Sequence, residues 1–482
     1  MSVACFVGVY GMGVMGQSLA LNISHHHYTL AVYNRDGDKT REFMQNKVQE
    51  TDQITPSYSL KDFVAALERP RKIILMVKAG TVVDLVTDGL LPYLEEGDIV
   101  IDAGNSFYKD TERRMKYYAE KGIKFFGMGV SGGEKGALLG PSIMPSGNKD
   151  VFNDHLKQLL KDIAAHTATG DSCCDYIGKG GSGHYVKMVH NGIEYGDMQI
   201  INEAYFMLKN VCGFSNAQIA DVFENWNRGR LQSYLVEITS KILRVKDPCG
   251  TGELVDAILD EAGQKGTGMW TAMDALEKHQ CVPTMCEAVF ARNLSAQKDE
   301  RVYAAHEFDK QAGGQNLSPK MSQEEINTFI TDLEQAVYAS KIMSYAQGFS
   351  LLQAASDTYQ WNLDLGNIAL LWREGCIIRA VFLERIKRAY DEGKVVNLML
   401  TDEFKDEIKS SVAAWRRVVI AGIAAGLYVP TIANSLLYFD GYTSEKLPAN
   451  LCQAQRDWFG AHTFKRVDKP RSESFHHIWE QM

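Results

Sequence analysis

Short apolar runs alternate with helix-like stretches through the first third of the chain. Strands that alternate with helices predict a parallel sheet covered by helices on both faces. We therefore expect a doubly wound α/β domain over residues 1–178. The strand candidates are residues 3–10, 29–34, 72–77, 98–103 and 124–130.

The strand signal disappears after about residue 178, and long segments with helical periodicity follow. They predict a large all-α domain over residues 179–440. Residues 441–482 are rich in aromatic and polar side chains and only weakly periodic, which predicts a C-terminal tail. The helical segments are roughly residues 182–210, 216–243, 253–262, 328–357, 364–390 and 402–426.

Residues 187–195, KMVHNGIEY, place polar side chains where a helix normally carries its apolar stripe. Lys187, His190, Asn191 and Glu194 have the i, i+3, i+4, i+7 spacing of a single helix face. Neighbouring apolar residues make the rest of this helix look buried, and buried polar groups need partners. The pattern predicts a helix whose inward face meets other polar side chains or a polar ligand.

Two helix pairs of the second part are faintly alike, which predicts an internal helical repeat. A helix with Tyr195 is followed by NAQIADVFENW, and a later helix with Tyr345 is followed by LGNIALLWREG. The second copy lacks the polar constellation. In its register, the four polar positions become Val337, Ser340, Lys341 and Ser344.

Length, charge and cysteine content limit the kinds of partner and location that we expect for this protein. A chain of 482 residues suggests two or more domains, and a net charge of −9 argues against nucleic acid as the main partner. No apolar run is long enough to span a bilayer, and a strand-like run at the N-terminus leaves no room for a signal peptide. Nine scattered cysteines have no zinc-type spacing. We expect a cytoplasmic protein without a metal site.

Residues 11–16, GMGVMG, fit the G-x-G-x-x-G pattern between the first predicted strand and a helix. Glycines there let the backbone approach a pyrophosphate, and the helix N-terminus supplies free N–H groups. The second strand ends in Asn34-Arg35-Asp36, where Asn34 carries no charge and Arg35 can pair with a 2′-phosphate. This pattern predicts a Rossmann-type domain that binds NADP, with Asp36 opposing the phosphate unless its carboxylate turns away or is paired.

Ten segments of the chain have a specific order and spacing: GMGVMG, NRD, VKAG (77–80), IDAGNS (101–106), GVSGGEKGALLGPSIMPSG (129–147), KMVHNGIEY, WNRGRLQSYLVEIT (226–239), AGQKGTGMW (262–270), AVFAR (288–292) and QAQRDWFGAHTF (453–464). Together they resemble the decarboxylating, NADP-dependent 6-phosphogluconate dehydrogenase family nearly from end to end. The related 3-hydroxyisobutyrate dehydrogenases share the glycine motif and the lysine but are shorter and lack the repeat and the tail.

The resemblance implies a reaction of the pentose phosphate pathway, in which 6-phosphogluconate is oxidised at C3 and loses C1 as CO2. Lys187 can take the C3 hydroxyl proton if burial keeps its amine neutral. Once protonated, Lys187 can donate to the C3 carbonyl oxygen while the C1–C2 bond breaks, so no metal is needed. Glu194 is expected to protonate the resulting enediol at C1.

The resemblance also implies the binding residues. For the substrate they are Asn105, Ser131, Gly132, Gly133, His190, Asn191, Tyr195, Lys265, Thr267, Arg292, Arg456 and His462. For NADP they are Gly11, Met12, Gly13, Val14, Met15, Gly16, Asn34, Arg35, Asp36, Val77, Lys78, Ala79 and Asn105. Arg456 and His462 belong to the tail, which the resemblance implies threads into the partner subunit of a homodimer.

The chain departs from the family pattern at three positions. Asp36 stands where Thr or Ser is usual, Ala103 replaces a glycine, and Met269 occupies a position often held by Lys. Two alternatives remain open. A β-hydroxyacid dehydrogenase with another substrate would dispense with Lys265, Arg292 and Arg456, and a silent NADP-binding homologue would lack Lys187 or Glu194.

Overall fold

The computed structural model describes residues 4–308 and 321–479, which belong to two compact units, Met1–Ser435 and Leu436–Met482. Val3, the first residue of the earliest predicted strand, lies outside the described residues, as do the two ends of the chain.

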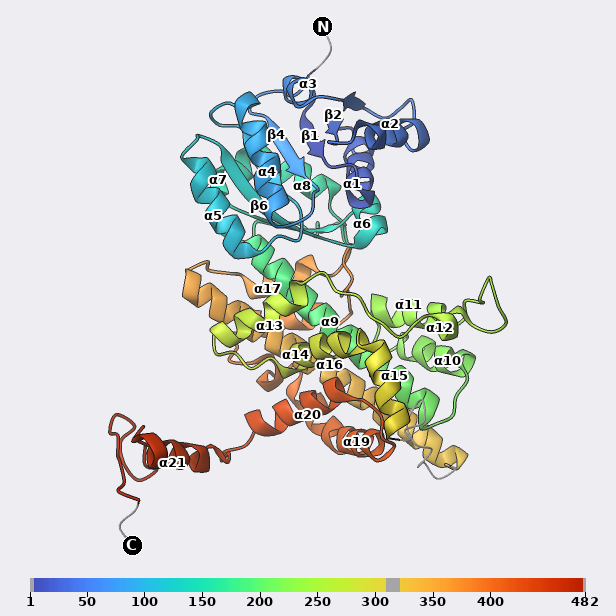
Figure 1. The fold of residues 1–482 in the computed structure, drawn as a ribbon, viewed down its shortest axis with the longest axis vertical. Coiled ribbons are helices and arrows are strands. Elements are labelled where there is room, and N and C mark those ends of the chain that lie inside the picture. The colour runs from blue at the N-terminus through green and yellow to red at the C-terminus, as the bar shows by residue number, and fades with distance from the viewer. Residues whose placement is uncertain (1–3, 309–320, 480–482) are drawn as a thin grey trace. The chain divides into compact units, whose positions relative to one another are not determined.

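The first unit begins with a seven-stranded sheet in the order β3-β2-β1-β4-β5-β6-β7 (Figure 1). All neighbouring strands are parallel except β6 and β7, which are antiparallel. The order reverses between β1 and β4, where open α/β sheets bind ligands. The strands are β1 (Val7–Tyr10), β2 (Leu30–Tyr33), β3 (Ile54–Ser57), β4 (Lys72–Leu75), β5 (Ile99–Asp102), β6 (Lys124–Ser131) and β7 (Ser142–Ser146).

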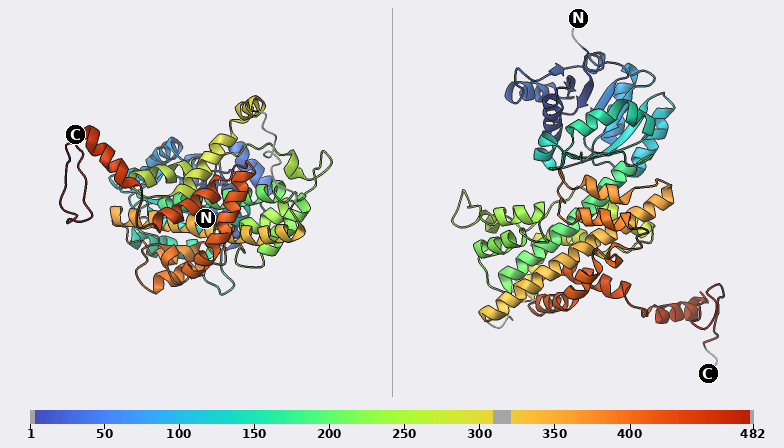
Figure 2. Two further views of the ribbon diagram at one scale, coloured as in Figure 1. Left: turned by 90° about the horizontal axis from the view of Figure 1, so that it is seen from below. Right: turned by 180° about the vertical axis from the view of Figure 1, so that it is seen from behind.

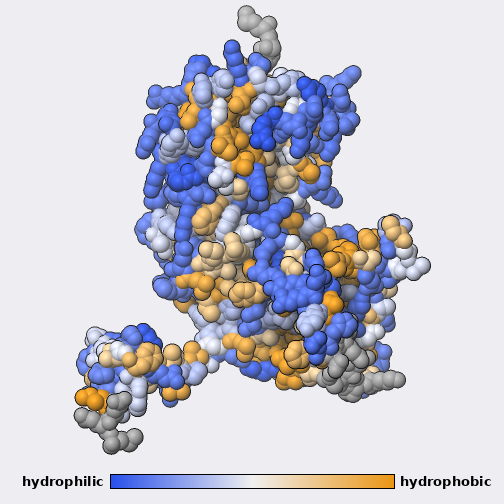
Figure 3. Space-filling view, in the orientation of Figure 1, coloured by the Kyte–Doolittle hydropathy of each residue, from blue (hydrophilic) through white to orange (hydrophobic). Residues whose placement is uncertain are grey.

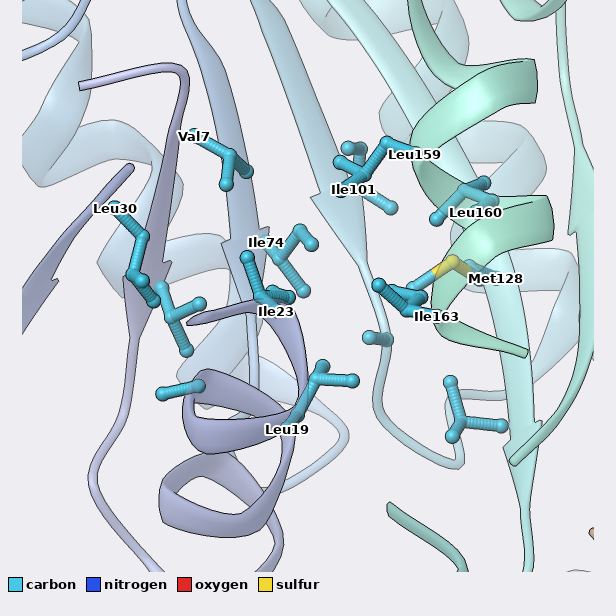
Figure 4. Close-up of a cluster of buried hydrophobic side chains, with 14 of the residues drawn as sticks. Val7, Leu19, Ile23, Leu30, Ile74, Ile101, Met128, Leu159, Leu160 and Ile163 are labelled. Carbon is cyan, nitrogen blue, oxygen red and sulfur yellow. The ribbon is translucent and has the colours of Figure 1, made fainter. Parts of the chain in front are cut away.

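Alternating side chains of these strands build one core on each face of the sheet. Ile74 and Ile101 point to the face covered by α1 and α8 (Figure 4), whereas Ile73 and Val100 point to the face covered by α3, α4 and α5. This confirms the predicted doubly wound α/β domain. Its helices are α1 (Val14–His25), α2 (Gly37–Asn46), α3 (Leu60–Ala65), α4 (Thr81–Leu90), α5 (Tyr108–Ala119), α6 (Gly133–Leu139), α7 (Lys149–Val151) and α8 (Lys157–Ile163).

Two strands were not predicted. β3 carries Pro56 inside a four-residue run, and a proline argues against a strand in sequence-based reasoning. It is tolerated here because β3 lies at the edge of the sheet. β7 follows β6 after a short helix and pairs with it antiparallel, from Gly127 opposite Ser146 to Ser131 opposite Ser142. The sheet is therefore mixed and not wholly parallel.

The rest of the first unit is helical, as predicted, and the described residues of this part contain no further strand. Two predicted long helices are each broken. Residues 216–243 form α10 and α11 because the chain turns between them and Ser233 caps α11, and residues 364–390 form α17 and α18 around Gly375, whose φ is +63°. The helices are α9 (Ser182–Asn210), α10 (Asn216–Trp226), α11 (Tyr234–Ile242), α12 (Leu254–Ala257), α13 (Thr267–Glu277), α14 (Pro283–Ser295), α15 (Lys298–Glu307), α16 (Gln323–Tyr359), α17 (Leu365–Leu371), α18 (Leu383–Asp391), α19 (Lys405–Ala424) and α20 (Pro430–Tyr442), which runs across the boundary between the units.

The long helices α9 and α16 pack side by side at the centre of the helical part (Figure 2). They are the helices that contain Tyr195 and Tyr345, the two members of the predicted repeat. The N-terminal half of α9 also packs against β6 and β7. One helix thus joins the sheet to the helical core.

The second unit contains α21 (Ala449–Gly460) and a folded-back segment after it, although this region was predicted only as a weakly periodic tail. Phe464 and Phe475 form a two-residue antiparallel bridge. Among all the described residues, no helix is both long and apolar enough to cross a bilayer. The same residues contain no group of three or more His, Cys, Asp or Glu side chains that could hold a metal ion. All nine cysteines are free.

Candidate active site

The polar face of α9 is buried against the sheet and the helical core. Lys187 and His190 are 6% and 0% exposed, and Lys187 Nζ lies 3.3 Å from His190 Nδ1. His190 Nδ1 is also 3.1 Å from Asn191 Oδ1. Glu194, one turn further along, is 3.8 Å from His190 Nδ1 and keeps a 21% exposed side chain. The four residues of the predicted constellation therefore form one connected cluster.

Burial shifts the pKa values of Lys187, His190 and Glu194 in the directions that favour their neutral forms. It lowers the pKa of the Lys187 amine, although the Glu194 carboxylate opposes that shift. It raises the pKa of Glu194, which the charges of Lys187 and Arg292 oppose. It also holds the pKa of His190 well below its usual range, and the Lys187 charge acts in the same direction. A neutral amine and a protonated carboxyl are the forms that a general base and a general acid require.

The end of β6 brings a second predicted group to the same cluster. Ser131 is the last residue of the strand, and its Oγ lies 3.2 Å from His190 Nε2. Gly132 follows with φ +121°, and a Cβ there would meet the carbonyl oxygen of Gly375 at 2.5 Å. Gly133 has φ +63° and open space around its missing side chain. This turn brings a hydroxyl to His190 and has two glycines with positive φ, whose backbone an anionic group can approach closely.

Gly129 within β6 makes room for the lysine itself. A Cβ at this position would lie 2.6 Å from Lys187 Cβ. Among the predicted residues, Asn105 follows β5 and is exposed in the loop at the carboxyl end of the sheet. Its part in the site remains a prediction.

Four further predicted residues lie on α9 (Tyr195), in the stretch before α13 (Lys265), on α13 (Thr267) and on α14 (Arg292). Thr267 begins α13, and its Oγ1 accepts a hydrogen bond from Asn191 Nδ2 at 3.2 Å. The Arg292 guanidinium lies 3.4 Å from the centre of the Tyr195 ring and donates to Gly263 O. Lys265 is exposed in the stretch before α13, two residues from Thr267. Of these residues, Arg292 is close enough to Glu194 for its charge to act on that carboxyl.

The glycine motif fits a dinucleotide pyrophosphate. Gly11 has φ +110°, and a Cβ there would lie 2.4 Å from the carbonyl oxygen of Met76. A Cβ at Gly16 would lie 1.8 Å from the carbonyl oxygen of Gly11, so this turn requires glycine. Gly13, the N-cap of α1, has open space where its side chain would be. Val14 and Met15 begin α1, so their backbone N–H groups lie in its first turn, where an anion binds.

The end of β2 is tied to this motif. Asn34 Oδ1 accepts a hydrogen bond from Met12 N at 3.0 Å, and Asn34 Nδ2 donates to Asp36 O. Asp36 is the N-cap of α2, where its carboxylate accepts from Asp38 N at 3.1 Å. Arg35 is exposed, and its charge opposes the rise in the pKa of Tyr10 that burial causes. The Asp36 carboxylate therefore caps a helix end, and the Arg35 charge is close enough to act on Tyr10 at the end of β1.

Val77, Lys78 and Ala79 follow β4, the strand next to β1 in the sheet. A Cβ at Gly11 would lie 3.3 Å from Val77 Cγ1, which places this loop against the glycine motif. Val77 and Ala79 are half-buried, and Lys78 is exposed.

Arg456 and His462 belong to the second unit, whereas the polar cluster of α9 belongs to the first. Arg456 is exposed on α21, and His462 is exposed just beyond the helix. Their participation in the site remains a prediction.

Sequence reasoning missed the segment between α17 and α18. The Trp372 ring meets the His190 ring edge to face at 5.5 Å, and Gly375 O lies against Gly132. Trp372 is also fully buried. A contact between residues so far apart in the sequence leaves no local pattern by which to find it.

The family comparisons agree with this geometry. The model described as the NAD binding domain of 6-phosphogluconate dehydrogenase matches residues 6–178, and the model of the 6-phosphogluconate dehydrogenase C-terminal domain matches residues 183–479. The chain is 49% identical over 480 residues to the decarboxylating 6-phosphogluconate dehydrogenase of Aggregatibacter actinomycetemcomitans, covering 99% of this chain and 97% of the relative. It is 50% identical over 474 residues to the NADP(+)-dependent, decarboxylating enzyme of Bacillus subtilis, covering 98% of both chains.

A solved structure is similar over its whole length. The 6-phosphogluconate dehydrogenase of Plasmodium falciparum, studied in its apo form and with NADP+ and 6-phosphogluconate, matches with a TM-score of 0.93 and 44% identity. The match covers 98% of this chain and 100% of that chain. The fold and the site define a dinucleotide-dependent dehydrogenase. The chain belongs to the 6-phosphogluconate dehydrogenase family.

Proposed function

We propose that this chain catalyses the oxidative decarboxylation of 6-phospho-D-gluconate to D-ribulose 5-phosphate and CO2, with reduction of NADP to NADPH. The observation that carries the proposal is the buried Lys187 amine, 3.3 Å from His190 and on one helix face with Glu194. Family membership supplies the substrate, because relatives about half identical to this chain are named for this reaction.

Lys187 acts first as the base. Its lowered pKa keeps a fraction of the amine neutral, so that it can accept the proton of the C3 hydroxyl. When bound at the glycine motif, NADP supplies the hydride acceptor for oxidation at C3. His190 and Asn191 hold Lys187 and bind substrate hydroxyls, and the neutral His190 ring adds no positive charge that would repel the lysine.

Decarboxylation uses the same lysine in its protonated form. The oxidised substrate is a β-keto acid, whose C1–C2 electrons move toward the C3 carbonyl as CO2 leaves. Lys187 donates its proton to that oxygen and so stabilises the developing charge. Glu194, whose pKa burial raises, then protonates the enediol carbon that becomes C1 of the product.

The two ends of the substrate are anionic, and different groups suit them. Ser131, Gly132 and Gly133 offer a hydroxyl and backbone N–H groups to the carboxylate, close to His190. Tyr195, Lys265, Thr267 and Arg292 lie at the Glu194 end and suit the phosphate, which needs cations. We assign Asn105, in the loop after β5, to both the cofactor and the substrate, because ligands bind at the carboxyl ends of strands in open α/β sheets.

We also propose that the protein is a homodimer in which the tail of each subunit completes the site of its partner, with Arg456 at the phosphate and His462 at a substrate oxygen. The helical part carries exposed large apolar side chains, a feature of protein interfaces. Figure 3 shows such hydrophobic residues among hydrophilic ones on one face of the molecule. The exposed large apolar side chains of the helical part include Ile258, Leu259, Leu276, Phe290, Tyr303 and Ile420.

The division of labour follows the chain. Residues 1–178 bind NADP, residues 179–440 bind substrate and dimerise, and residues 441–482 reach the partner subunit. A cytoplasmic location suits nine free thiols.

One assay tests the reaction. The full-length protein is mixed with 6-phosphogluconate and NADP, and NADPH absorbance is followed together with CO2 release. Equal amounts of both are expected. NADPH without CO2, or turnover of other β-hydroxyacids in preference to 6-phosphogluconate, would point to the second enzyme class. Binding of NADP without turnover of any such acid would point to a silent homologue.

A further inference from the structure

The C-terminal unit contains a buried carboxylate that the reaction does not use. Asp457 on α21 is fully buried, and both of its oxygens accept hydrogen bonds. Thr463 N and His476 Nδ1 each lie 2.9 Å from Oδ1. His477 N and Trp479 Nε1 lie 3.1 Å and 2.9 Å from Oδ2. One side chain therefore ties the loop after α21 and the end of the described chain to the helix.

These contacts hold a loop in an unfavourable conformation. Ala461 and Thr463, on either side of His462, have φ of 49° and 60°. Left-handed backbone is uncommon for residues other than glycine, and for a β-branched threonine it needs support from its surroundings. Asp457 accepts the Thr463 N–H, and Gln453 Nε2 donates to Thr463 O at 2.6 Å. Both backbone groups of the strained Thr463 are thus fixed from α21.

The same helix also orients the two side chains assigned to the substrate. Gln453 Oε1 accepts a hydrogen bond from Arg456 Nη1 at 3.0 Å, so one amide links Arg456 to the loop that carries His462. The His462 ring packs over Gly460, where a Cβ would lie 2.6 Å from Nε2. Phe459 meets that ring edge to face at 5.9 Å.

Asp457 is held in its charged form. Burial acts to raise its pKa, but the bonds from His476, His477, Trp479 and Thr463 together hold the pKa of this carboxyl well below its usual range. An acceptor with four donors keeps its geometry at any pH near neutrality. The arrangement is therefore fixed before any ligand arrives, which reduces the ordering cost of binding.

We propose that Asp457 and Gln453 are positioning residues that hold Arg456 and His462 as a preformed clamp for the phosphorylated end of the substrate, with Gly460 leaving room for the His462 ring. The proposal rests on the proposed function, since the clamp residues are those assigned to 6-phosphogluconate. Its geometry lies wholly within the second unit.

Two variants separate positioning from folding. Asp457→Asn keeps the size of the side chain but replaces one acceptor oxygen with an NH2 group that cannot accept the two N–H donors there. Gly460→Ala should leave α21 folded, because alanine favours a helix and only the mobile ring of His462 must move. Asp468→Asn is the matched control, because its carboxylate pairs with Arg466 on the exposed surface of the same unit.

We expect both test variants to raise KM for 6-phosphogluconate about tenfold while kcat and KM for NADP change less than about threefold, the pattern of lost uniform binding. In a His462→Ala background, Gly460→Ala should have little further effect, since the ring it displaces is gone. Calorimetric binding of 6-phosphogluconate to each full-length variant should show the same loss without turnover.

Three results would overturn the clamp. The first is a KM and a binding constant for 6-phosphogluconate that stay within about twofold of wild type in both variants. The second is a parallel loss of kcat and of both KM values in proportion to unfolded protein, which means a structural role only. The third is wild-type protein that does not bind 6-phosphogluconate. Wild-type protein that binds this acid without oxidising it would instead remove the proposed function, and the binding measurements would still test the clamp.

Discussion

Lys341 Nζ lies 2.5 Å from Asp197 Oδ2, and each side chain is only 1% exposed. Asp197 follows Glu194 by three residues on α9, and Lys341 comes from the facing helix α16. Burial raises the pKa of Asp197 and Lys341 opposes that rise. In the predicted repeat, Lys341 occupies the position of Asn191. At this position α16 thus carries a charge that pairs with α9, whereas α9 carries a residue of the polar cluster.

Breaking this pair should destabilise the protein strongly. Lys341→Met leaves Asp197 buried without a partner, which typically costs about 3–5 kcal/mol. Adding Asp197→Leu to that variant should restore part of the loss. Urea unfolding measures the free energy of unfolding of the single and the double variant. Lys409→Met on α19 is the control, because its pair with Asp406 is exposed and should contribute little. Equal stability of Lys341→Met and wild type would show that the buried pair is not needed.

Lys187→Met should abolish oxidation while NADP binding survives. Methionine matches the length of lysine but moves no proton, and loss of a general base costs about 10²–10⁴-fold in rate. In the wild type, kcat/KM should rise with pH as Lys187 loses its proton, with an inflection below the ordinary lysine value of 10.5 because burial lowers its pKa. Stopped-flow NADPH absorbance and cofactor titration measure the two effects. Lys179→Met, an exposed lysine before α9, is the control. Near-normal turnover of Lys187→Met would remove its assigned role.

Glu194→Gln should keep the shape of the site but slow the overall reaction severely. The amide cannot give a proton to the enediol, so uptake of solvent deuterium at C1 of the product should fall with turnover. Burial raises the pKa of Glu194, so the wild-type rate should fall as rising pH removes that proton. Together with Lys187 this predicts a bell-shaped pH profile. A Glu194→Gln enzyme with wild-type turnover would show that another group supplies the proton.

Cofactor choice should depend on two neighbouring residues with opposite effects. Arg35→Ala should weaken NADP much more than NAD, by about 1.5–3 kcal/mol, since only NADP presents a 2′-phosphate. Asp36→Ser should strengthen the preference for NADP, because serine can still cap α2 without a negative charge. Dissociation constants for both cofactors measure this, with Lys61→Ala on α3 as the control. Equal weakening of both cofactors by Arg35→Ala would mean that Arg35 acts through packing.

Local patterns predicted most of the sheet and the long helices because apolar periodicity records which face is buried. They failed where a tertiary contact decides. β3 was missed because Pro56 argues against a strand, and the proline is tolerated only because β3 lies at the edge of the sheet. β7 was missed because it depends on antiparallel pairing with β6. The turn at Gly375 interrupts a predicted helix where it packs under Gly132, a contact that no local pattern reports.

The site was predictable to the extent that it lies on one helix. Spacing alone placed Lys187, His190, Asn191 and Glu194 on a common face, and the structure connects them. Ser131 was assigned to the substrate through the family resemblance, and its contact with His190 was not predicted. Neither the spacing of the residues nor the family resemblance predicted the Trp372 ring beside His190.

The tail allows a test of the dimer by complementation. A Lys187→Met chain is mixed with an Arg456→Ala chain under conditions that exchange subunits. If each tail serves the partner, heterodimers contain one site with both defects and one with neither. Activity should then return to about half of the wild-type value per heterodimer, by the symmetry of a two-fold dimer. Each variant alone should stay inactive or nearly so, which is the control. Heterodimers that form, as shown by mass spectrometry, and remain inactive would mean that the tail serves its own subunit.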